Sequence, residues 1–259
     1  MDSTANWKAY SEIMNIAIIP ARYASTRFPR KMLATLGGKP LLQWVWEGVQ
    51  QSEKIQRVYI ATDHQEIVQL AENFNAEVLM TDPDLPSGTD RIAAALEQLE
   101  QQNIRPEIIV NVQGDEPQIK GTVLDALLQT MLESNASMAT LARRMDENEE
   151  ASNPHIVKVV TDHQGKALYF SRAPIPFHRD KNEAAAESYY HHIGIYGYRT
   201  EILRRIVQWP QTTLERMEKL EQLRALQNGI AIQVVPTSLK TIGVDTPEDL
   251  ELLESMITK

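Results

Sequence analysis

Strand-like and helix-like segments alternate through the first half of the chain, and this alternation limits the folds available to it. The runs at 15–20 (NIAIIP), 57–62 (RVYIAT) and 76–80 (AEVLM) are short and apolar, as strands are. Apolar residues at helical spacing lie between them, for example over 40–51. The run at 107–113 (EIIVNVQ) is apolar on both faces, which is typical of a central parallel strand. The pattern predicts a parallel sheet with helices on both faces.

The pattern changes after residue 135, where strand signals predominate. The segments with strand character are 136–142, 155–161, 166–171 and 191–198. We expect a single α/β domain over residues 14–259, with an inserted, smaller mixed sheet around 135–198. Residues 1–13 are expected to form an N-terminal extension.

Three helix ends are marked in the sequence. Asp63 is expected to cap a helix that begins at His64. The segment 214–229 carries an apolar stripe and is predicted as one amphipathic helix that ends at Gly229. Thr246 is expected to cap the last helix, with Pro247 in its first turn.

Charge and composition exclude several classes of protein. The net charge is −9, so the molecule as a whole repels nucleic acid and anionic membranes. The absence of cysteine excludes disulfides, thiol catalysis and cysteine-ligated metals. No apolar stretch approaches the ~20 residues of a membrane span. We expect a cytoplasmic protein without nucleic-acid or membrane partners, which binds any anion at a local cationic patch.

Such a patch follows the first predicted strand. Arg22, Arg27, Arg30 and Lys31 lie close together after the apolar run at 15–20. Parallel sheets bind ligands beyond the carboxyl ends of their strands, and Arg and Lys bind phosphate there. The loop has no glycine and matches neither the P-loop nor the dinucleotide fingerprint. It is either a polyphosphate site of another kind or a solvated cationic loop.

Two segments offer carboxylates for a metal ion. Asp115 and Glu116 follow the apolar strand at 107–113, and Asp115 is a natural Mg²⁺ ligand at that position. The alternative is an ordinary turn. Asp245 precedes the predicted last helix, and its surroundings by themselves favour helix capping over metal binding.

Several other polar residues lie where a ligand could reach them, and each also has a plain structural interpretation. They are Ser87, Gly88 and Arg91 in SGTDR, Arg172 in SRAPIP, His192 and Tyr196 on one face of a strand, and Glu221 and Gln222 beside a helical stripe. The structural alternatives are a helix cap, a surface arginine, core packing and solvent exposure, respectively.

The combination of motifs is more specific than any one of them. The chain resembles the 3-deoxy-manno-octulosonate cytidylyltransferases (CMP-Kdo synthetases) in the order of PARYASTR, SGTDR, NVQGDEP, ALYFSRAPIP, HIGIYGYR, LEQLR and GVDTPEDL. The resemblance extends from about Met14 to the C-terminus. It implies a Rossmann-like nucleotidyltransferase α/β/α sandwich whose smaller mixed-sheet subdomain forms a homodimer contact.

The resemblance also implies a reaction. CTP and Kdo would give CMP-Kdo and pyrophosphate, with Mg²⁺ as cofactor, for lipopolysaccharide biosynthesis. The attacking group would be the anomeric hydroxyl of the sugar, and no side chain is assigned as a general base. The alternatives are transfer to a related acidic sugar (8-amino Kdo or sialic acid) and a non-catalytic homologue that binds CTP.

Residue roles follow from the resemblance, position by position. The triphosphate would be bound by Arg22, Arg27 and Lys31, and the cytosine and ribose would be surrounded by Ala21, Arg22, Ser87, Gly88 and Gln113. The metal would be bound by Asp115 and Asp245, which with Arg22 and Lys31 form the implied catalytic set. The sugar acid would be bound by Arg172, His192, Tyr196, Glu221 and Gln222, with Arg172 on its carboxylate.

The chain departs from the family pattern in the cationic loop. The usual family sequence is LPGKPL, whereas this chain has FPRKML over 28–33, with Arg30 in place of the glycine and Met32 in place of the second proline. Arginine rarely adopts a positive φ. Either the loop has another shape, or Arg30 supplies a fourth cation to the triphosphate.

Overall fold

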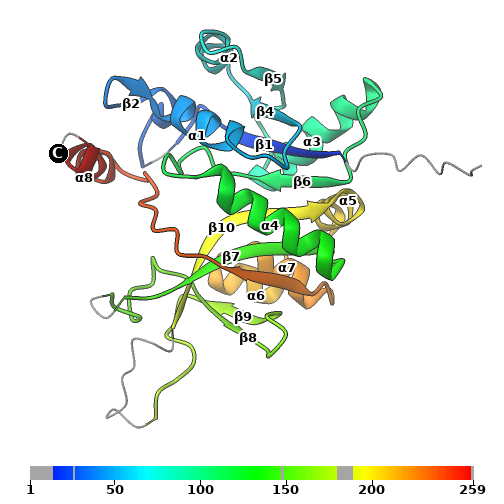
Figure 1. Ribbon diagram of the computed structural model, residues 1–259, viewed down its shortest axis with the longest axis vertical. Coiled ribbons are helices and arrows are strands. Elements are labelled where there is room, and N and C mark those ends of the chain that lie inside the picture. The colour runs from blue at the N-terminus through cyan, green and yellow to red at the C-terminus, as the bar shows by residue number, and fades with distance from the viewer. Residues whose placement is uncertain (1–13, 26, 147–148, 180–188, 258–259) are drawn as a thin grey trace, which may run out of the picture.

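A mixed sheet forms the centre of the computed structural model, which describes residues 14–25, 27–146, 149–179 and 189–257 (Figure 1). The predicted extension at 1–13 lies outside the described residues. The strands are β1 (Asn15–Ala21), β2 (Thr35–Leu36), β3 (Lys39–Pro40), β4 (Arg57–Thr62), β5 (Glu77–Met80), β6 (Ile108–Asn111), β7 (Met138–Arg144), β8 (Lys158–Thr161), β9 (Ala167–Ser171), β10 (Tyr190–Arg199) and β11 (Ile232–Pro236). Within the described residues, nine of them form one sheet, with β11-β7-β10-β6-β1-β4-β5 as its main order.

The first half of the sheet is parallel, as the alternation of strand and helix signals predicts. β1 pairs in parallel with β4 on one side and with β6 on the other, and β4 pairs in parallel with β5. Every residue of β1 is buried, because helices cover both faces of the sheet. The carboxyl ends of these strands therefore meet at one edge.

The second half of the sheet is mixed. β10 pairs antiparallel with β6 and with β7, and β11 pairs in parallel with β7. β8 and β9 branch from β10 at the far end of the sheet (Figure 1). The region 135–198, expected as a mixed-sheet insertion, thus contributes β7 and β10 to the central sheet and β8 and β9 to its extension.

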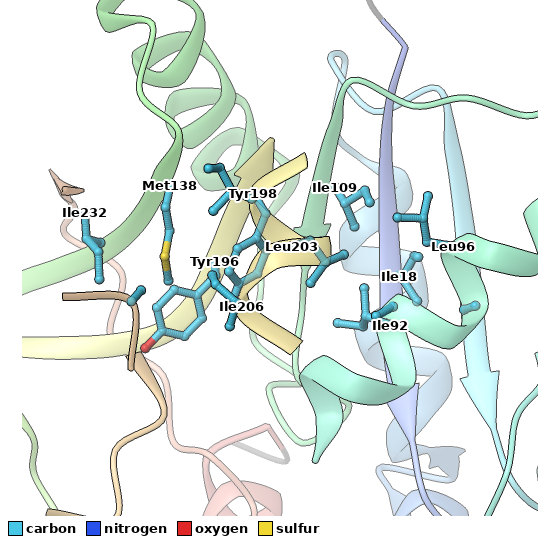
Figure 2. Close-up of a cluster of buried hydrophobic side chains, with 14 of the residues drawn as sticks. Ile18, Ile92, Leu96, Ile109, Met138, Tyr196, Tyr198, Leu203, Ile206 and Ile232 are labelled. Atoms are coloured by element: carbon cyan, nitrogen blue, oxygen red, sulfur yellow. The ribbon is translucent and has the colours of Figure 1, made fainter. Parts of the chain in front are cut away.

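Helices cover the two faces of the sheet, and the resulting α/β/α sandwich confirms the predicted fold class (Figure 1). The helices are the 3₁₀ helix η1 (Lys31–Leu33), α1 (Leu41–Gln50), α2 (Gln65–Glu72), α3 (Gly88–Gln101), α4 (Gly121–Ser134), α5 (Thr200–Gln208), α6 (Thr213–Glu218), α7 (Gln222–Gln227) and α8 (Pro247–Ile257). Alternate residues of β1 enter opposite cores: Ile16 and Ile18 face α3 and α5, whereas Ala17 and Ile19 face α1 and α4. Figure 2 shows the first of these cores.

The prediction of one helix over 214–229 is wrong. The chain forms two short helices, α6 and α7, because Lys219 adopts a left-handed conformation with a φ of 53° between them. Met217, assigned to the apolar stripe, is 76% exposed, while Leu220 and Leu223 are buried. The break places Glu221 and Gln222 at the start of α7. Gly229 does end the segment, at a φ of 78°.

The predicted cap at Asp63 is also wrong, whereas the predicted cap of α8 is confirmed. His64 caps α2, since its side chain accepts from the Glu66 N–H. At α8, the Asp249 carboxylate accepts from the Thr246 N–H at 2.9 Å, and the Thr246 hydroxyl accepts from the Asp249 N–H at 3.3 Å. No helix among the described residues is long and apolar enough to cross a membrane.

A buried ion pair holds α6 against α7, and its removal is the first testable change. The Arg224 guanidinium donates to both Glu215 oxygens at 2.6 and 2.9 Å, and both side chains are buried. Arg224→Met is expected to lower the free energy of unfolding by about 3 kcal/mol, because it leaves a buried carboxylate unpaired. Urea denaturation measures this loss. Arg216→Met, at an exposed position on α6, is the matched control and should change stability by less than about 1 kcal/mol. Equal effects from the two variants would contradict this account.

Candidate functional site

A cavity of about 340 Å³ lies at the edge where the parallel strands end. Four separate parts of the chain line it. They are Pro20, Arg22, Ser25, Arg27, Lys31 and Met32 after β1; Leu85, Pro86, Ser87, Gly88 and Arg91 at the start of α3; Gln113, Gly114 and Asp115 after β6; and Asp245 before α8. The structure thus brings together every residue assigned to the nucleotide or the metal except Ala21. Ala21 is fully buried at the end of β1, between the lining residues Pro20 and Arg22.

Lys31 connects the two candidate metal carboxylates. Its Nζ lies 2.6 Å from Asp115 Oδ2 and 3.1 Å from Asp245 Oδ1. Arg27 Nη2 lies 3.1 Å from Asp245 Oδ2. Lys31 is only 7% exposed, so its ammonium is fixed by these contacts. Cations and carboxylates therefore form a single charged network on one wall of the cavity.

Arg30 replaces the glycine of the family pattern and takes a backbone conformation that glycine favours. Arg30 adopts a left-handed conformation, with a φ of 59° and a ψ of 26°. Its guanidinium pairs with Glu66 and lies 5.5 Å from the centre of the Tyr23 ring, and it does not line the cavity. Arg30 therefore does not add a fourth cation to the cavity, because its contacts with Glu66 and Tyr23 hold the side chain elsewhere. The other expectation, a different loop shape, stays a prediction.

A second ion pair, absent from the sequence-based assignments, anchors the start of the same loop. Asp63 Oδ2 lies 2.9 Å from Arg91 Nη2, and both side chains are nearly buried. The other oxygen, Asp63 Oδ1, accepts from the Tyr23 N–H at 2.9 Å. The motif SGTDR drew attention to Arg91, but the local pattern around Asp63 indicated only a helix cap. The pairing depends on β4 and α3 lying side by side, which only the sheet order decides.

Glu116 does not line this cavity but another one, which Arg27 and Asp245 also line. Burial, and secondarily the charge of Asp115, raises the pKa of Glu116 to about 7, against the opposing effect of a hydrogen bond with Thr241. Its Oε2 is buried without a hydrogen-bond partner among the described residues. Of the two carboxylates in the GDEP turn, Asp115 alone lines the cavity.

A smaller cavity of about 60 Å³ adjoins the first one. Tyr196, Glu221 and Gln222 line it, and Gln113 lines both cavities. Ser87 Oγ lies 3.3 Å from Glu221 Oε1, so α3 and α7 meet at this junction. Burial raises the pKa values of Tyr196 and Glu221. Three of the five residues assigned to the sugar acid therefore lie together, next to the nucleotide side.

His192 joins this group through Tyr196. Its Nε2 lies 3.0 Å from the Tyr196 hydroxyl and 3.0 Å from the Thr140 hydroxyl, and the Phe170 ring approaches it edge-on. Figure 2 shows the Tyr196 ring beside Met138 in the core under the sheet. Burial lowers the pKa of His192 to about 3, so its imidazole is neutral near pH 7.

Arg172 lies apart from both cavities. Its guanidinium donates to the backbone carbonyls of Glu218 and Pro154, each at 2.8 Å, and to Lys219 at 3.5 Å. These carbonyls fix the side chain against the break between α6 and α7. The structure therefore does not bring Arg172 to the other residues assigned to the sugar acid.

The donor set of the larger cavity suits a hard cation. Asp115 and Asp245 offer carboxylate oxygens beside one ammonium, and both are partly exposed and line the cavity. The described residues contain no group of three side chains able to hold a metal by themselves. Mg²⁺ typically uses one or two carboxylates and completes its shell with phosphate and water. The residues present therefore fit Mg²⁺ bound together with a polyphosphate.

The chain is similar in sequence to several known proteins. Residues 16–234 match the sequence profile of a protein family described as Cytidylyltransferase. A 3-deoxy-manno-octulosonate cytidylyltransferase from Thermodesulfovibrio yellowstonii is 47% identical over 251 residues, which are 95% of this chain and 98% of the relative. Another from Geobacter sulfurreducens is 48% identical over 248 residues, covering 92% and 97%. The similarity includes the segments that form the cavity.

The solved structures agree with the sequence relatives. CMP:2-keto-3-deoxy-manno-octonic acid synthetase complexed with CTP superimposes with a TM-score of 0.86 at 38% identity, over 95% of this chain and 98% of that one. A cytidylyltransferase from Leptospira borgpetersenii, with a TM-score of 0.62 and 18% identity, shares the fold.

Because His192 is buried, the folded protein is expected to lose stability in acid. Its pKa is lowered from 6.5 to about 3 by burial, so the unfolded chain binds a proton more readily, and stability is lost as the pH falls below 6.5. Between about pH 7 and pH 4, wild type is expected to lose about 3 kcal/mol more than His192→Gln. Urea denaturation at each pH measures this difference. Parallel pH profiles for the two proteins would show that His192 does not remain neutral in the fold.

Proposed function

This chain belongs to the 3-deoxy-manno-octulosonate cytidylyltransferase family, and we propose that it transfers the cytidylyl group of CTP to Kdo. The observation that carries the proposal is the single charged network of Arg27, Lys31, Asp115 and Asp245 in one cavity. Cations for a triphosphate and carboxylates for its metal ion lie side by side there. A protein that merely retained the fold would have no need of this arrangement.

The cationic residues bind and orient the triphosphate. Arg22 and Arg27 lie toward the open side of the cavity, where they neutralise the pyrophosphate portion of CTP. Lys31, the most buried of the three at 7% exposed, lies beside the two carboxylates and neutralises charge near the phosphorus–oxygen bond that breaks. Ser87, Gly88 and Gln113 line the same cavity and border the nucleoside.

Asp115 and Asp245 would hold Mg²⁺. When bound, the ion neutralises the α-phosphate and lowers the pKa of the attacking hydroxyl. The chain positions the reactants: the C2 hydroxyl oxygen of Kdo forms a bond to the α-phosphorus, and the bond from that phosphorus to pyrophosphate breaks. The hydroxyl proton is lost to water, and no covalent enzyme intermediate is formed. Catalysis then depends on placement and charge.

We place the sugar across the junction of the two cavities. The smaller cavity, at about 60 Å³, has room for about two water molecules, so the sugar extends from it toward Gln113. Tyr196, Glu221 and Gln222 offer polar groups on that side. His192 orients the Tyr196 hydroxyl, because the two are hydrogen-bonded. In this proposal Arg172 reaches the Kdo carboxylate only if it exchanges its carbonyl contacts for that carboxylate.

The remaining expectations belong to the same proposal. We place the reaction in the cytoplasm, where CTP is available, and assign its product to lipopolysaccharide biosynthesis. We also propose that the chain acts as a homodimer. Sedimentation of the purified protein, with and without CTP, tests the last of these.

Pyrophosphate release tests the reaction directly. The protein is assayed with Mg²⁺, CTP and Kdo, with UTP, 8-amino Kdo and sialic acid as alternative substrates. Release with CTP and Kdo alone is the expected result. Release with a different acidic sugar would identify that sugar as the acceptor. CTP binding without release from any pair would overturn the catalytic proposal.

Loss of either metal carboxylate should abolish most of the activity. Asp115→Asn and Asp245→Asn are each expected to lower kcat by about 10²- to 10³-fold, because each removes charge from the metal site. The matched control is Asp146→Asn, which removes the same charge from an exposed pair with Lys240. Its kcat should equal that of wild type. Near-normal turnover of Asp115→Asn or Asp245→Asn at saturating Mg²⁺ would remove that residue from the assignment.

Arg30 should be dispensable, in contrast to Arg22. Arg30→Gly removes an exposed ion pair but relieves a left-handed arginine, and these two small effects oppose each other. Its KM for CTP should stay within about two-fold of wild type. Arg22→Ala should raise this KM by about ten-fold, because a charge-assisted contact to phosphate is lost. Steady-state kinetics at varied CTP compares them, and a large effect of Arg30→Gly would mean that Arg30 does reach the triphosphate.

A further inference from the structure

The last helix packs on a small apolar cluster of its own. This docking cluster consists of Phe28, Leu36, Leu41, Trp44, Val244, Leu250 and Leu253. It is separate from the two cores that cover the sheet. Leu253 is fully buried in it, while Leu252, the preceding residue of α8, is 49% exposed. Figure 1 shows α8 beside β2 at the edge of the molecule, at the end of an extended segment.

That extended segment carries Asp245 to the cavity. After β11 the chain leaves the sheet and runs past the turn that contains Asp115. The Ile242 N–H donates to Gln118 Oε1, and the Val244 N–H donates to the Asp115 carbonyl, both at 2.9 Å. The two metal-binding segments are therefore joined by a backbone hydrogen bond one residue before Asp245.

The first turn of α8 fixes Asp245 from the other side. Asp249 Oδ2 accepts from the Asp245 N–H at 3.0 Å and from the Thr246 N–H at 2.9 Å. This capping arrangement exists only while α8 begins at Pro247. The position of Asp245 thus depends on the position of α8.

The charges of Asp115 and Asp245 are the reason why the position of α8 matters for Asp245. Asp245 and Asp115 both contact Lys31, so two like charges are held close together. Their repulsion favours separation. The Asp245 side chain is about half exposed, and ion pairs with Lys31 and Arg27 hold it. The apolar contacts of the neighbouring Val244 and of Leu253 restrain the backbone that carries Asp245.

The docking cluster also includes the cationic loop. Phe28 follows Arg27, which pairs with Asp245, and packs against the cluster that holds Leu253. The loop that would bind triphosphate and the helix that would place the second metal carboxylate therefore share one set of apolar contacts. A change in the packing of the loop is therefore expected to alter the packing of the helix, and the reverse.

We infer that Leu253 is a positioning residue, which docks α8 so that Asp245 stands opposite Asp115 for a divalent cation bound with the nucleotide. This inference rests on the proposed function. Leu253 touches neither substrate nor metal. It acts through Val244 and the first turn of α8, and its removal should leave the central sheet intact because the docking cluster is separate from both cores.

The test compares Leu253→Ala with its neighbour Leu252→Ala, which makes the same change on an exposed face of the same helix. CTP-dependent Mn²⁺ binding, followed by electron paramagnetic resonance, reports on the metal site without turnover. Pyrophosphate release reports kcat and the Mg²⁺ concentration for half-maximal rate. Leu253→Ala is expected to weaken Mn²⁺ binding and to lower kcat by about ten- to hundred-fold. Leu252→Ala should match wild type, and Leu253→Met, which conserves volume, should restore most of both.

Thermal unfolding separates positioning from general stability. The main transition of Leu253→Ala is expected to coincide with that of Leu252→Ala. Equal Mn²⁺ affinities for the two variants would overturn the inference, and so would a lowered main transition, which would make α8 part of the global fold. If wild type itself releases no pyrophosphate, the proposed function fails, while the Mn²⁺ comparison still decides the role of Leu253.

Discussion

The contact of one lysine with two aspartates organises the site. Lys31 Nζ touches Asp115 and Asp245, which come from distant parts of the chain and repel each other. The loop after β1, the turn after β6 and the segment before α8 must all meet at this point. Elements at a distance from the cavity matter because each of them positions one of these three segments. The parallel pairing of β1 with β6 delivers two of them, and the docking of α8 delivers the third.

Two ion pairs besides those of Lys31 hold the cationic loop in shape. Asp63 with Arg91 fixes the start of the loop through the Tyr23 N–H, and Glu66 with Arg30 fixes its end. The second pair shows how tertiary contacts override a local preference. A left-handed arginine costs about 1–2 kcal/mol, an amount that several surrounding contacts can offset. The loop therefore accommodates a residue that its own backbone disfavours.

The residues assigned to the sugar acid could be predicted less well from the sequence than those that line the larger cavity. Tyr196, Glu221 and Gln222 meet because β10 and α7 converge on the end of β6. Their place depends on the break at Lys219 and on the buried pair of Arg224 with Glu215. A helical pattern in the sequence cannot reveal such a break, because the apolar spacing continues through it. Arg172, from a motif equally similar to the family, is instead held by backbone carbonyls.

The sequence by itself determined the parallel half of the sheet, the sandwich and most of the residues that line the larger cavity. Apolar periodicity and motif order are local properties, and the carboxyl ends of parallel strands share an edge whatever their order. Only the tertiary structure decided that Asp63 pairs with Arg91, that Glu116 is buried beside Asp115, and that α8 positions Asp245. These contacts join residues far apart in the chain. Their burial and charge pairing follow from strand order and helix docking, which no local pattern encodes.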